Sequence, residues 1–142
     1  MATVYRVGII GCGSISHLHM KGYLGEDRFR VVAISDPVPE ALKDFGDQYG
    51  IENEKRYTEA RDMLDKEALD VISICTWHKL HAPMTIAACA RRPKAILCEK
   101  PMGINMGECD EMMIAVRRNG VKLAIAHPVS YTHLTLPTRD LV

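Results

Sequence analysis

The sequence has no excess of either charge and no long apolar run. Its 142 residues hold 18 Lys and Arg against 18 Asp and Glu, so charge gives no argument for binding nucleic acid or an anionic membrane. No apolar stretch reaches the roughly 20 residues of a membrane-spanning helix. The first residues lack the charged and apolar segments of a signal peptide. We therefore expect a cytoplasmic protein without nucleic-acid or membrane partners.

Cysteines are few, scattered and odd in number, which argues against a disulfide framework. They are Cys12, Cys75, Cys89, Cys98 and Cys109. Four of them lie in apolar segments, where cysteine usually behaves as a small buried hydrophobe. Cys75, His78 and His81 are spaced by threes, but no fourth ligand follows at a spacing typical of zinc sites. We expect reduced thiols and no metal site.

Short apolar runs alternate with longer amphipathic ones along the chain. The expected strands are residues 4–10, 29–35, 55–57, 69–75, 95–98 and 121–126, and the expected helices are 14–24, 39–49, 58–64, 83–90 and 105–119. This alternation predicts an α/β fold, a Rossmann-like doubly wound parallel sheet with helices on both faces. Ligands of such sheets bind at the carboxyl ends of the strands. Those ends are residues 11–13, Asp36, residues 75–76, residues 99–100 and His127.

A glycine-rich turn joins the first strand to the first helix. Residues 11–16, Gly-Cys-Gly-Ser-Ile-Ser, follow the G-x-G-x-x-G pattern with serine in the third place. The first glycine allows the tight turn and the second lets the backbone approach a pyrophosphate, which the N–H groups of the helix start attract. The motif alone is equally compatible with a turn that has no chemical role. The residues predicted to contact the cofactor here are Gly11, Cys12, Gly13, Ser14 and Ile15.

Asp36 ends the second strand, a little over twenty residues beyond the glycines. A carboxylate there can accept hydrogen bonds from the adenosine ribose hydroxyls. The alternative is a helix N-cap before Pro37. With strand, glycine loop, helix, strand and acid in this order, the sequence predicts dinucleotide binding. Because Asp36 should repel a 2′-phosphate and no arginine follows it, NAD is favoured over NADP.

Two further segments carry a resemblance to a known family. They are residues 74–81, Ile-Cys-Thr-Trp-His-Lys-Leu-His, and residues 98–101, Cys-Glu-Lys-Pro. Together with the glycine loop, they resemble the glucose–fructose oxidoreductase/inositol dehydrogenase/MocA (Gfo/Idh/MocA) family over residues 4–127. The Glu-Lys-Pro triplet is the specific part. The family joins a Rossmann domain to a larger α/β domain with the substrate site, so the resemblance implies that this second domain is missing here.

The resemblance also implies roles for individual residues. Cys75 and Thr76 line the cofactor through backbone contacts, and Glu99 contacts the nicotinamide ribose. Lys100 is the catalytic residue, which lies beside the nicotinamide and orients or helps deprotonate the substrate hydroxyl. A positioned base and a cation beside a developing alkoxide both favour hydride loss from a carbinol carbon. From spacing alone, Glu99 and Lys100 also fit a solvated charge pair at a strand end.

Two histidines follow the fourth strand. The family commonly has Pro-Asn where this chain has Trp77-His78, so His78 either replaces the asparagine as a hydrogen-bonding group or reshapes the pocket. His81 matches the family's histidine and is predicted to belong to the cofactor site. A capping contact at the helix start is an equal alternative for His81.

The resemblance implies an oxidoreductase that transfers a hydride between a nicotinamide cofactor and a sugar or polyol-like substrate. The alternative is a non-catalytic dinucleotide sensor or regulator on the same fold. Lys100 favours the enzyme, because a sensor has no need of it. The domain alone is expected to be inactive. The sequence does not decide whether the full-length protein is a homo-oligomer.

The pattern of strands and helices stops after His127. Residues 129–138, Val-Ser-Tyr-Thr-His-Leu-Thr-Leu-Pro-Thr, match the translation of a transposase adapter used in short-read library preparation, and residues 139–142 fit its index and stop codon. The alternative is a genuine short tail. We predict that residues 1–127 form the dinucleotide-binding domain and that residues 128–142 are translated adapter.

Overall fold

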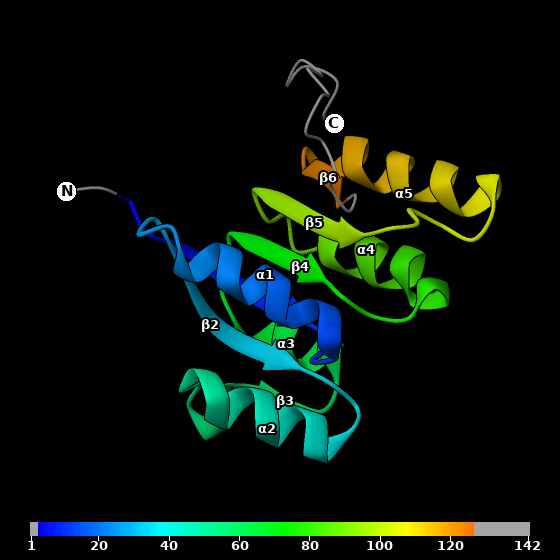
Figure 1. The fold of residues 1–142 in the computed structure, drawn as a ribbon. Coiled ribbons are helices and arrows are strands. Elements are labelled where there is room, and N and C mark those ends of the chain that lie inside the picture. The colour runs from blue at the N-terminus through cyan, green and yellow to red at the C-terminus, as the bar shows by residue number, and fades with distance from the viewer. Residues whose placement is uncertain (1–2, 127–142) are drawn as a thin grey trace, which may run out of the picture.

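The computed structural model describes residues 3–126. His127 and the predicted adapter-derived segment, residues 128–142, lie outside the described residues. Strands and helices alternate along the chain (Figure 1). The elements are β1 Tyr5–Ile10, α1 Ser14–Leu24, β2 Phe29–Ser35, α2 Pro39–Tyr49, the short 3₁₀ helix η1 Asn53–Lys55, β3 Arg56–Tyr57, α3 Ala60–Lys66, β4 Val71–Ile74, the 3₁₀ helix η2 His78–Leu80, α4 His81–Cys89, β5 Ala95–Glu99, α5 Met106–Asn119 and β6 Lys122–Ala126.

All six strands form one parallel sheet in the order β3-β2-β1-β4-β5-β6. The predicted fold class is therefore confirmed. The strand order reverses between β1 and β4, and open α/β sheets bind ligands in the crevice at such a point. Ile10 is in register with Ser35 on one side and with Ile74 on the other. The segments that begin at Gly11, Asp36 and Cys75 consequently leave the sheet at one level.

Helix termini follow local signals in the sequence. Pro39 begins α2, and Gly50 ends it in the left-handed conformation at φ 68°. The Asn105 side chain accepts a hydrogen bond of 2.9 Å from the Glu108 N–H, which is one of the two bonds of a capping box. The Glu108 carboxylate accepts from the Ile104 N–H, one residue earlier than in the standard box.

Two predicted helices have shifted bounds. The third helix extends to Lys66, beyond the predicted end at residue 64. The fourth begins at His81 rather than at Pro83, because η2 leads directly into it. Patterns of side chains locate the interior of a helix better than its ends, where 3₁₀ turns and fraying blur the boundary.

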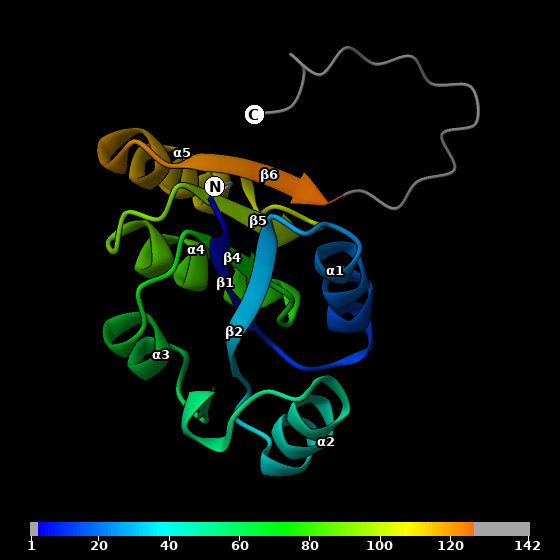
Figure 2. The ribbon, with the colours of Figure 1, turned by 90° about the vertical axis from the view of Figure 1, so that its left-hand side faces the viewer.

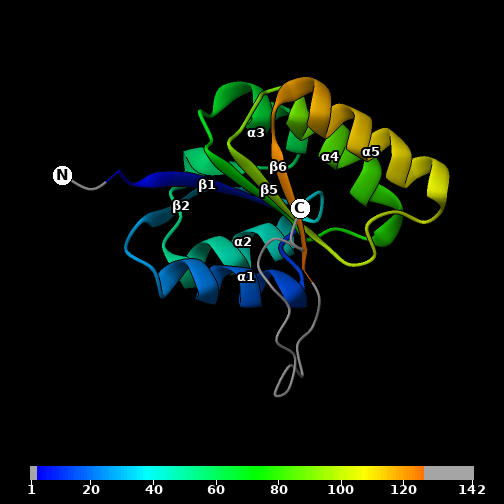
Figure 3. The ribbon, with the colours of Figure 1, turned by 90° about the horizontal axis from the view of Figure 1, so that it is seen from above.

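Helices α1 and α2 lie on one face of the sheet, and α3, α4 and α5 on the other, as two perpendicular views show (Figures 2 and 3). Each face has its own buried apolar cluster. The cluster under α3, α4 and α5 includes Met63, Ile72, Ile74, Ile96, Met112 and Leu123. The cluster under α1 and α2 includes Val7, Ile9, Met20, Ile34 and Phe45. None of the helices within residues 3–126 has the length and apolar character needed to cross a membrane.

Glu67, just after α3, is a buried carboxylate with three partners. Its side chain is 3% exposed. It accepts hydrogen bonds from Lys55 Nζ at 3.0 and 3.1 Å and from the Tyr57 hydroxyl, and Arg6 Nη2 lies 3.4 Å away. Burial opposes ionisation, but the hydrogen bonds from Tyr57 and Lys55 and the charges of Lys55 and Arg6 outweigh it. The pKa of Glu67 therefore lies below its ordinary value.

We expect this cluster to make the free energy of unfolding fall at acidic pH. A folded-state pKa below the unfolded value of about 4.3 means that the stabilisation is present above that pH and is lost as pH falls through the folded pKa. Glu67→Gln should lower the free energy of unfolding at pH 7 by about 2 kcal/mol. It should also flatten the pH dependence of stability below about pH 5. Urea unfolding at several pH values measures both, with the exposed Glu54→Gln as control. An unchanged pH dependence in Glu67→Gln would contradict the assignment.

Candidate functional site

The glycine loop leaves the start of α1 open. Gly11 has φ 97°, and its N–H donates to the Ser35 carbonyl at 2.7 Å. Gly13 is the N-cap of α1, where no side chain caps the helix and no acid occupies the first turn. A Cβ built on Gly13 meets no atom within 4 Å. The helix start therefore presents N–H groups, without a competing carboxylate, to open space, and this arrangement fits a bound pyrophosphate.

Asp36 is joined to the glycine loop by a direct hydrogen bond. Its Oδ2 accepts from the Cys12 N–H at 2.8 Å, and its Oδ1 accepts from the Val38 N–H at 2.8 Å. The N-cap of α2 is Val38, which has no side-chain cap. The alternative of Asp36 as helix N-cap is therefore wrong: Asp36 instead closes a turn before the helix. Each oxygen keeps a second lone pair, which remains suited to a ribose hydroxyl.

A hollow of about 160 Å³ opens beside Asp36 at the carboxyl edge of the sheet. Gly11, Asp36 and Thr76 line it, as does Arg61 from α3. Arg61 was not predicted from the sequence, because it does not directly follow Asp36. The sheet places the α3 start beside the end of β2, so that an arginine and the predicted ribose acid share one hollow.

Cys75 and Thr76 leave β4 next to the glycine loop. The Cys75 N–H donates to the Ile10 carbonyl at 2.7 Å, and Thr76 lines the hollow with Asp36. Burial, reinforced by the negative charge of Glu99, raises the pKa of the Cys75 thiol. Burial and Asp36 likewise raise the pKa of Cys12 to about 12. These thiols stay protonated, so Cys75 and Cys12 contribute backbone and packing rather than nucleophiles.

His81 lies in the interior, and both of its ring nitrogens face backbone carbonyls. Nδ1 lies 2.6 Å from the Pro101 carbonyl, and Nε2 lies 3.1 Å from that of Thr76. The helix start at Leu80 has no side-chain cap, so the capping alternative for His81 is wrong. The ring instead ties the turn after β4 to the turn after β5. His78, in η2, is exposed.

Cys75, His78 and His81, which are spaced by threes and were not expected to bind a metal, do not form a metal-binding cluster in the described residues. In the part of the chain that the structure describes, no group of three His, Cys, Asp or Glu side chains is arranged to hold a metal ion. His78 and His81 are near neighbours, with ring centroids 5.7 Å apart, but both His81 nitrogens are already directed at carbonyl oxygens.

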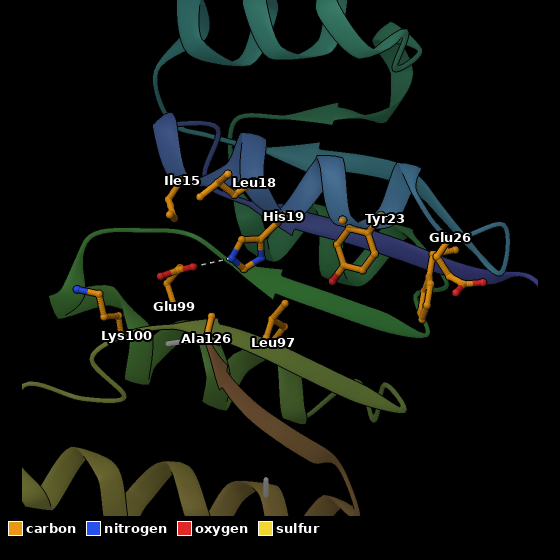
Figure 4. Close-up of a pocket in the computed structure, with 11 residues that line it drawn as sticks. Ile15, Leu18, His19, Tyr23, Glu26, Leu97, Glu99, Lys100 and Ala126 are labelled. Atoms are coloured by element: carbon orange, nitrogen blue, oxygen red, sulfur yellow. Dashed lines mark hydrogen bonds and ion pairs between the residues drawn. The ribbon is translucent and has the colours of Figure 1, made fainter. Parts of the chain in front are cut away.

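Glu99 ends β5, Lys100 follows it, and their side chains diverge. The Glu99 carboxylate turns inward and lies 2.7 Å from His19 Nε2 (Figure 4). Lys100 is exposed and points away from that pair. A solvated Glu99–Lys100 pair, the alternative from spacing, is therefore wrong. Lys100 keeps its amine directed to solvent, where a substrate can reach it.

A groove of about 500 Å³ runs beside Glu99 and Lys100, between α1 and the strands β5 and β6. Its lining is mostly apolar and includes Ile15, Leu18, Tyr23, Leu97 and Ala126 (Figure 4). His19 lies in the same wall. His19 was not predicted as a site residue. The sequence nevertheless holds a signal for it, since His19 and Tyr23 are four residues apart and therefore share one helix face.

Comparisons with known proteins agree with this geometry. The profile of the "Oxidoreductase family, NAD-binding Rossmann fold", GFO_IDH_MocA, matches residues 5–127. The chain is 36% identical over 118 residues to the uncharacterized oxidoreductase YrbE of Bacillus subtilis, covering 83% of this chain and 34% of that protein. It is 31% identical over 121 residues to the D-apiose dehydrogenase of Paraburkholderia graminis, covering 85% and 32%.

Solved structures give the same result. The WlbA dehydrogenase of Bordetella pertussis, in complex with NADH and UDP-GlcNAcA, superposes with a TM-score of 0.81 at 28% identity, over 87% of this chain and 37% of that one. An oxidoreductase of Agrobacterium radiobacter, in complex with NAD⁺, L-tartaric acid and magnesium, gives 0.82 at 26% identity, over 87% and 35%. The chain thus spans about a third of the length of the relatives it matches.

Proposed function

We propose that this chain, which belongs to the Gfo/Idh/MocA family of NAD-binding oxidoreductases, supplies the cofactor-binding site and the proton-transferring lysine for hydride transfer between a nicotinamide and a substrate carbon that alternates between hydroxyl and carbonyl. The observation that carries the proposal is the carboxyl edge of the sheet. There the uncapped start of α1, the Asp36 carboxylate, Glu99 and Lys100 all lie at strand ends of one parallel sheet.

Each part of this edge suits one part of a dinucleotide. The N–H groups at the start of α1 bind the pyrophosphate, and Gly13 leaves room for its approach. Asp36 accepts hydrogen bonds from the adenosine ribose, and its bond to Cys12 keeps the carboxylate beside the loop. Cys75 and Thr76 contribute backbone, and Glu99 accepts from the nicotinamide ribose. When bound, the cofactor supplies a hydride acceptor or donor at its nicotinamide.

Lys100 acts on the substrate. Its Nζ accepts the proton of the reacting hydroxyl, or stabilises the oxygen as negative charge develops on it. We assign the substrate to the sugars and polyols, because relatives include dehydrogenases named for D-apiose and myo-inositol. Residues 1–127 would be the cofactor domain, with residues 128–142 from a sequencing adapter. The chain alone should not catalyse the reaction. The protein should act in the cytoplasm without nucleic-acid or membrane partners.

Cofactor titration tests the proposal. We expect the chain to bind NAD more tightly than NADP, because the Asp36 carboxylate repels a 2′-phosphate. Asp36→Ala should lower the affinity for NAD by about tenfold and narrow the difference in affinity between the two cofactors. Calorimetry gives both affinities. The exposed Asp44→Ala, on α2, is a control that should change neither.

Arg61 sharpens the same experiment. In the Asp36→Ala background, its guanidinium can pair with a 2′-phosphate in the hollow that it lines with residue 36. Adding Arg61→Ala should therefore remove most of the NADP affinity that Asp36→Ala gains, with little effect on NAD. Equal or tighter NADP binding by the unaltered chain would overturn the assignment of Asp36.

A further inference from the structure

A buried hydrogen-bond chain runs from α1 through β4 to the end of β5. The Tyr23 hydroxyl lies 2.6 Å from Ser73 Oγ, and Ser73 Oγ lies 3.1 Å from His19 Nδ1. His19 Nε2 lies 2.7 Å from Glu99 Oε1. Ser73 is fully buried, and the side chains of His19 and Glu99 are only 5% and 13% exposed. Polar groups are seldom buried unless each finds a partner, and this chain gives every member at least one.

The direction of each hydrogen bond in this series follows from which atoms can donate a proton. An ionised Glu99 carboxylate only accepts, so His19 Nε2 carries the proton between them. Burial raises the pKa of Tyr23, although its bond to Ser73 partly offsets the effect, so its hydroxyl keeps its proton. Tyr23 can then donate to Ser73, and Ser73 to His19 Nδ1. If Nδ1 of His19 also carries a proton, the Ser73 hydroxyl accepts a hydrogen bond from it instead. The Nε2 proton is still directed at Glu99 in that case.

The arrangement resembles a Ser-His-acid triad, but it cannot act as one. Ser73 lies in the centre of the sheet with no exposed surface, so no substrate carbonyl can reach its oxygen. The contacts of His19 therefore serve Glu99. Within residues 3–126, His19 holds Oε1 of Glu99, and no side chain forms a hydrogen bond with Oε2.

We propose that His19 is a positioning residue, which holds one oxygen of Glu99 so that the other meets the nicotinamide ribose, and so links both ends of the dinucleotide site through α1. The proposal rests on the proposed function, in which Glu99 contacts that ribose. Helix α1 begins in the glycine loop at Ser14. His19 is five residues further along this rigid helix, which corresponds to about 7.5 Å. One element thereby fixes the spacing between the phosphate-binding N–H groups and the ribose acceptor.

Two amide substitutions separate this role from simple packing. The amide nitrogen of glutamine can reach the position of His19 Nε2, whereas that of asparagine reaches only the position of Nδ1. His19→Asn should therefore lose the bond to Glu99, and His19→Gln should keep it. We expect His19→Asn to weaken NAD binding by about tenfold or more and His19→Gln to restore most of it.

ADP provides the second measurement, because it contains the adenosine and the diphosphate but no nicotinamide ribose. His19→Asn should leave ADP affinity within about twofold of the unaltered chain, since the phosphate loop is intact. The matched control is His17→Asn. His17 is two residues away on the same helix but bonds the Tyr49 hydroxyl at 2.6 Å, so this variant should bind NAD normally.

The outcomes are distinct. Equal NAD affinities for His19→Asn and His19→Gln, or parallel losses of NAD and ADP, would overturn the positioning role and leave dinucleotide binding standing. No NAD binding by the unaltered chain would overturn the proposed function and this inference with it. Nitrogen-15 NMR of the His19 ring adds a test without cofactor: Nε2 should carry a proton, and an unprotonated Nε2 contradicts the assignment.

Discussion

Replacing Lys100 by alanine in the full-length protein is expected to lower kcat by about a hundredfold or more, the usual contribution of an acid–base group. Lys100 is the side chain at the end of β5 that points to solvent beside the groove, whereas Glu99 turns inward to His19. The affinity for NAD should change little, because Lys100 acts on the substrate. Steady-state kinetics with a sugar or polyol substrate, together with NAD titration, measures the two effects separately.

Arginine at the same position distinguishes two ways in which Lys100 could act. Lys100→Arg keeps a positive charge but cannot release its proton near neutral pH. If Lys100 accepts the substrate proton, the arginine variant should be nearly as slow as Lys100→Ala. The exposed Lys122→Ala, at the start of β6 and the opposite edge of the sheet, is the control. Near-normal kcat in Lys100→Ala would remove this residue from the mechanism.

Gly11→Ala should destabilise the fold by about 3 kcal/mol or more, which lowers the melting temperature by about 10 °C or more. At φ 97° an alanine is strained. Its Cβ would also lie 2.6 Å from the Cys75 carbonyl oxygen and 2.8 Å from its carbon. These are backbone atoms at the end of β4, so relief requires the loop and the strand to move apart. Thermal and urea unfolding measure the loss.

Gly13→Ala is the matched variant. Gly13 has φ −83°, and a Cβ there meets nothing within 4 Å. Stability should therefore change by less than about 1 kcal/mol. The new methyl group nevertheless enters the space where a pyrophosphate approaches, so NAD affinity should fall by about tenfold or more. A Gly13→Ala chain that binds NAD normally would show that the phosphates do not approach this glycine.

The fold class and the order of the elements could be predicted from local sequence patterns. Alternating apolar runs and helical periodicity are local signals, and they predicted each strand and α-helix to within a few residues, but not the 3₁₀ helices η1 and η2. Pro39 and Gly50 mark the ends of α2 because proline and glycine restrict or free their own backbone angles. The glycine loop, Asp36 and the Glu-Lys-Pro triplet were likewise visible, because each lies at the end of a predicted strand.

Which of these residues contact one another could not be predicted in this way, because it depends on how the elements pack. His19 and Glu99 are 80 positions apart. They come together because β4 and β5 follow β1 in the sheet order and α1 lies against that part of the sheet, where His19 contacts Ser73 and Glu99. Arg61 shares a hollow with Asp36 because β3 pairs with β2 and brings α3 to the same edge. His81 turned inward to two carbonyls. Local patterns encode backbone conformation, whereas contacts between distant side chains depend on strand order, register and helix rotation, which no single segment specifies.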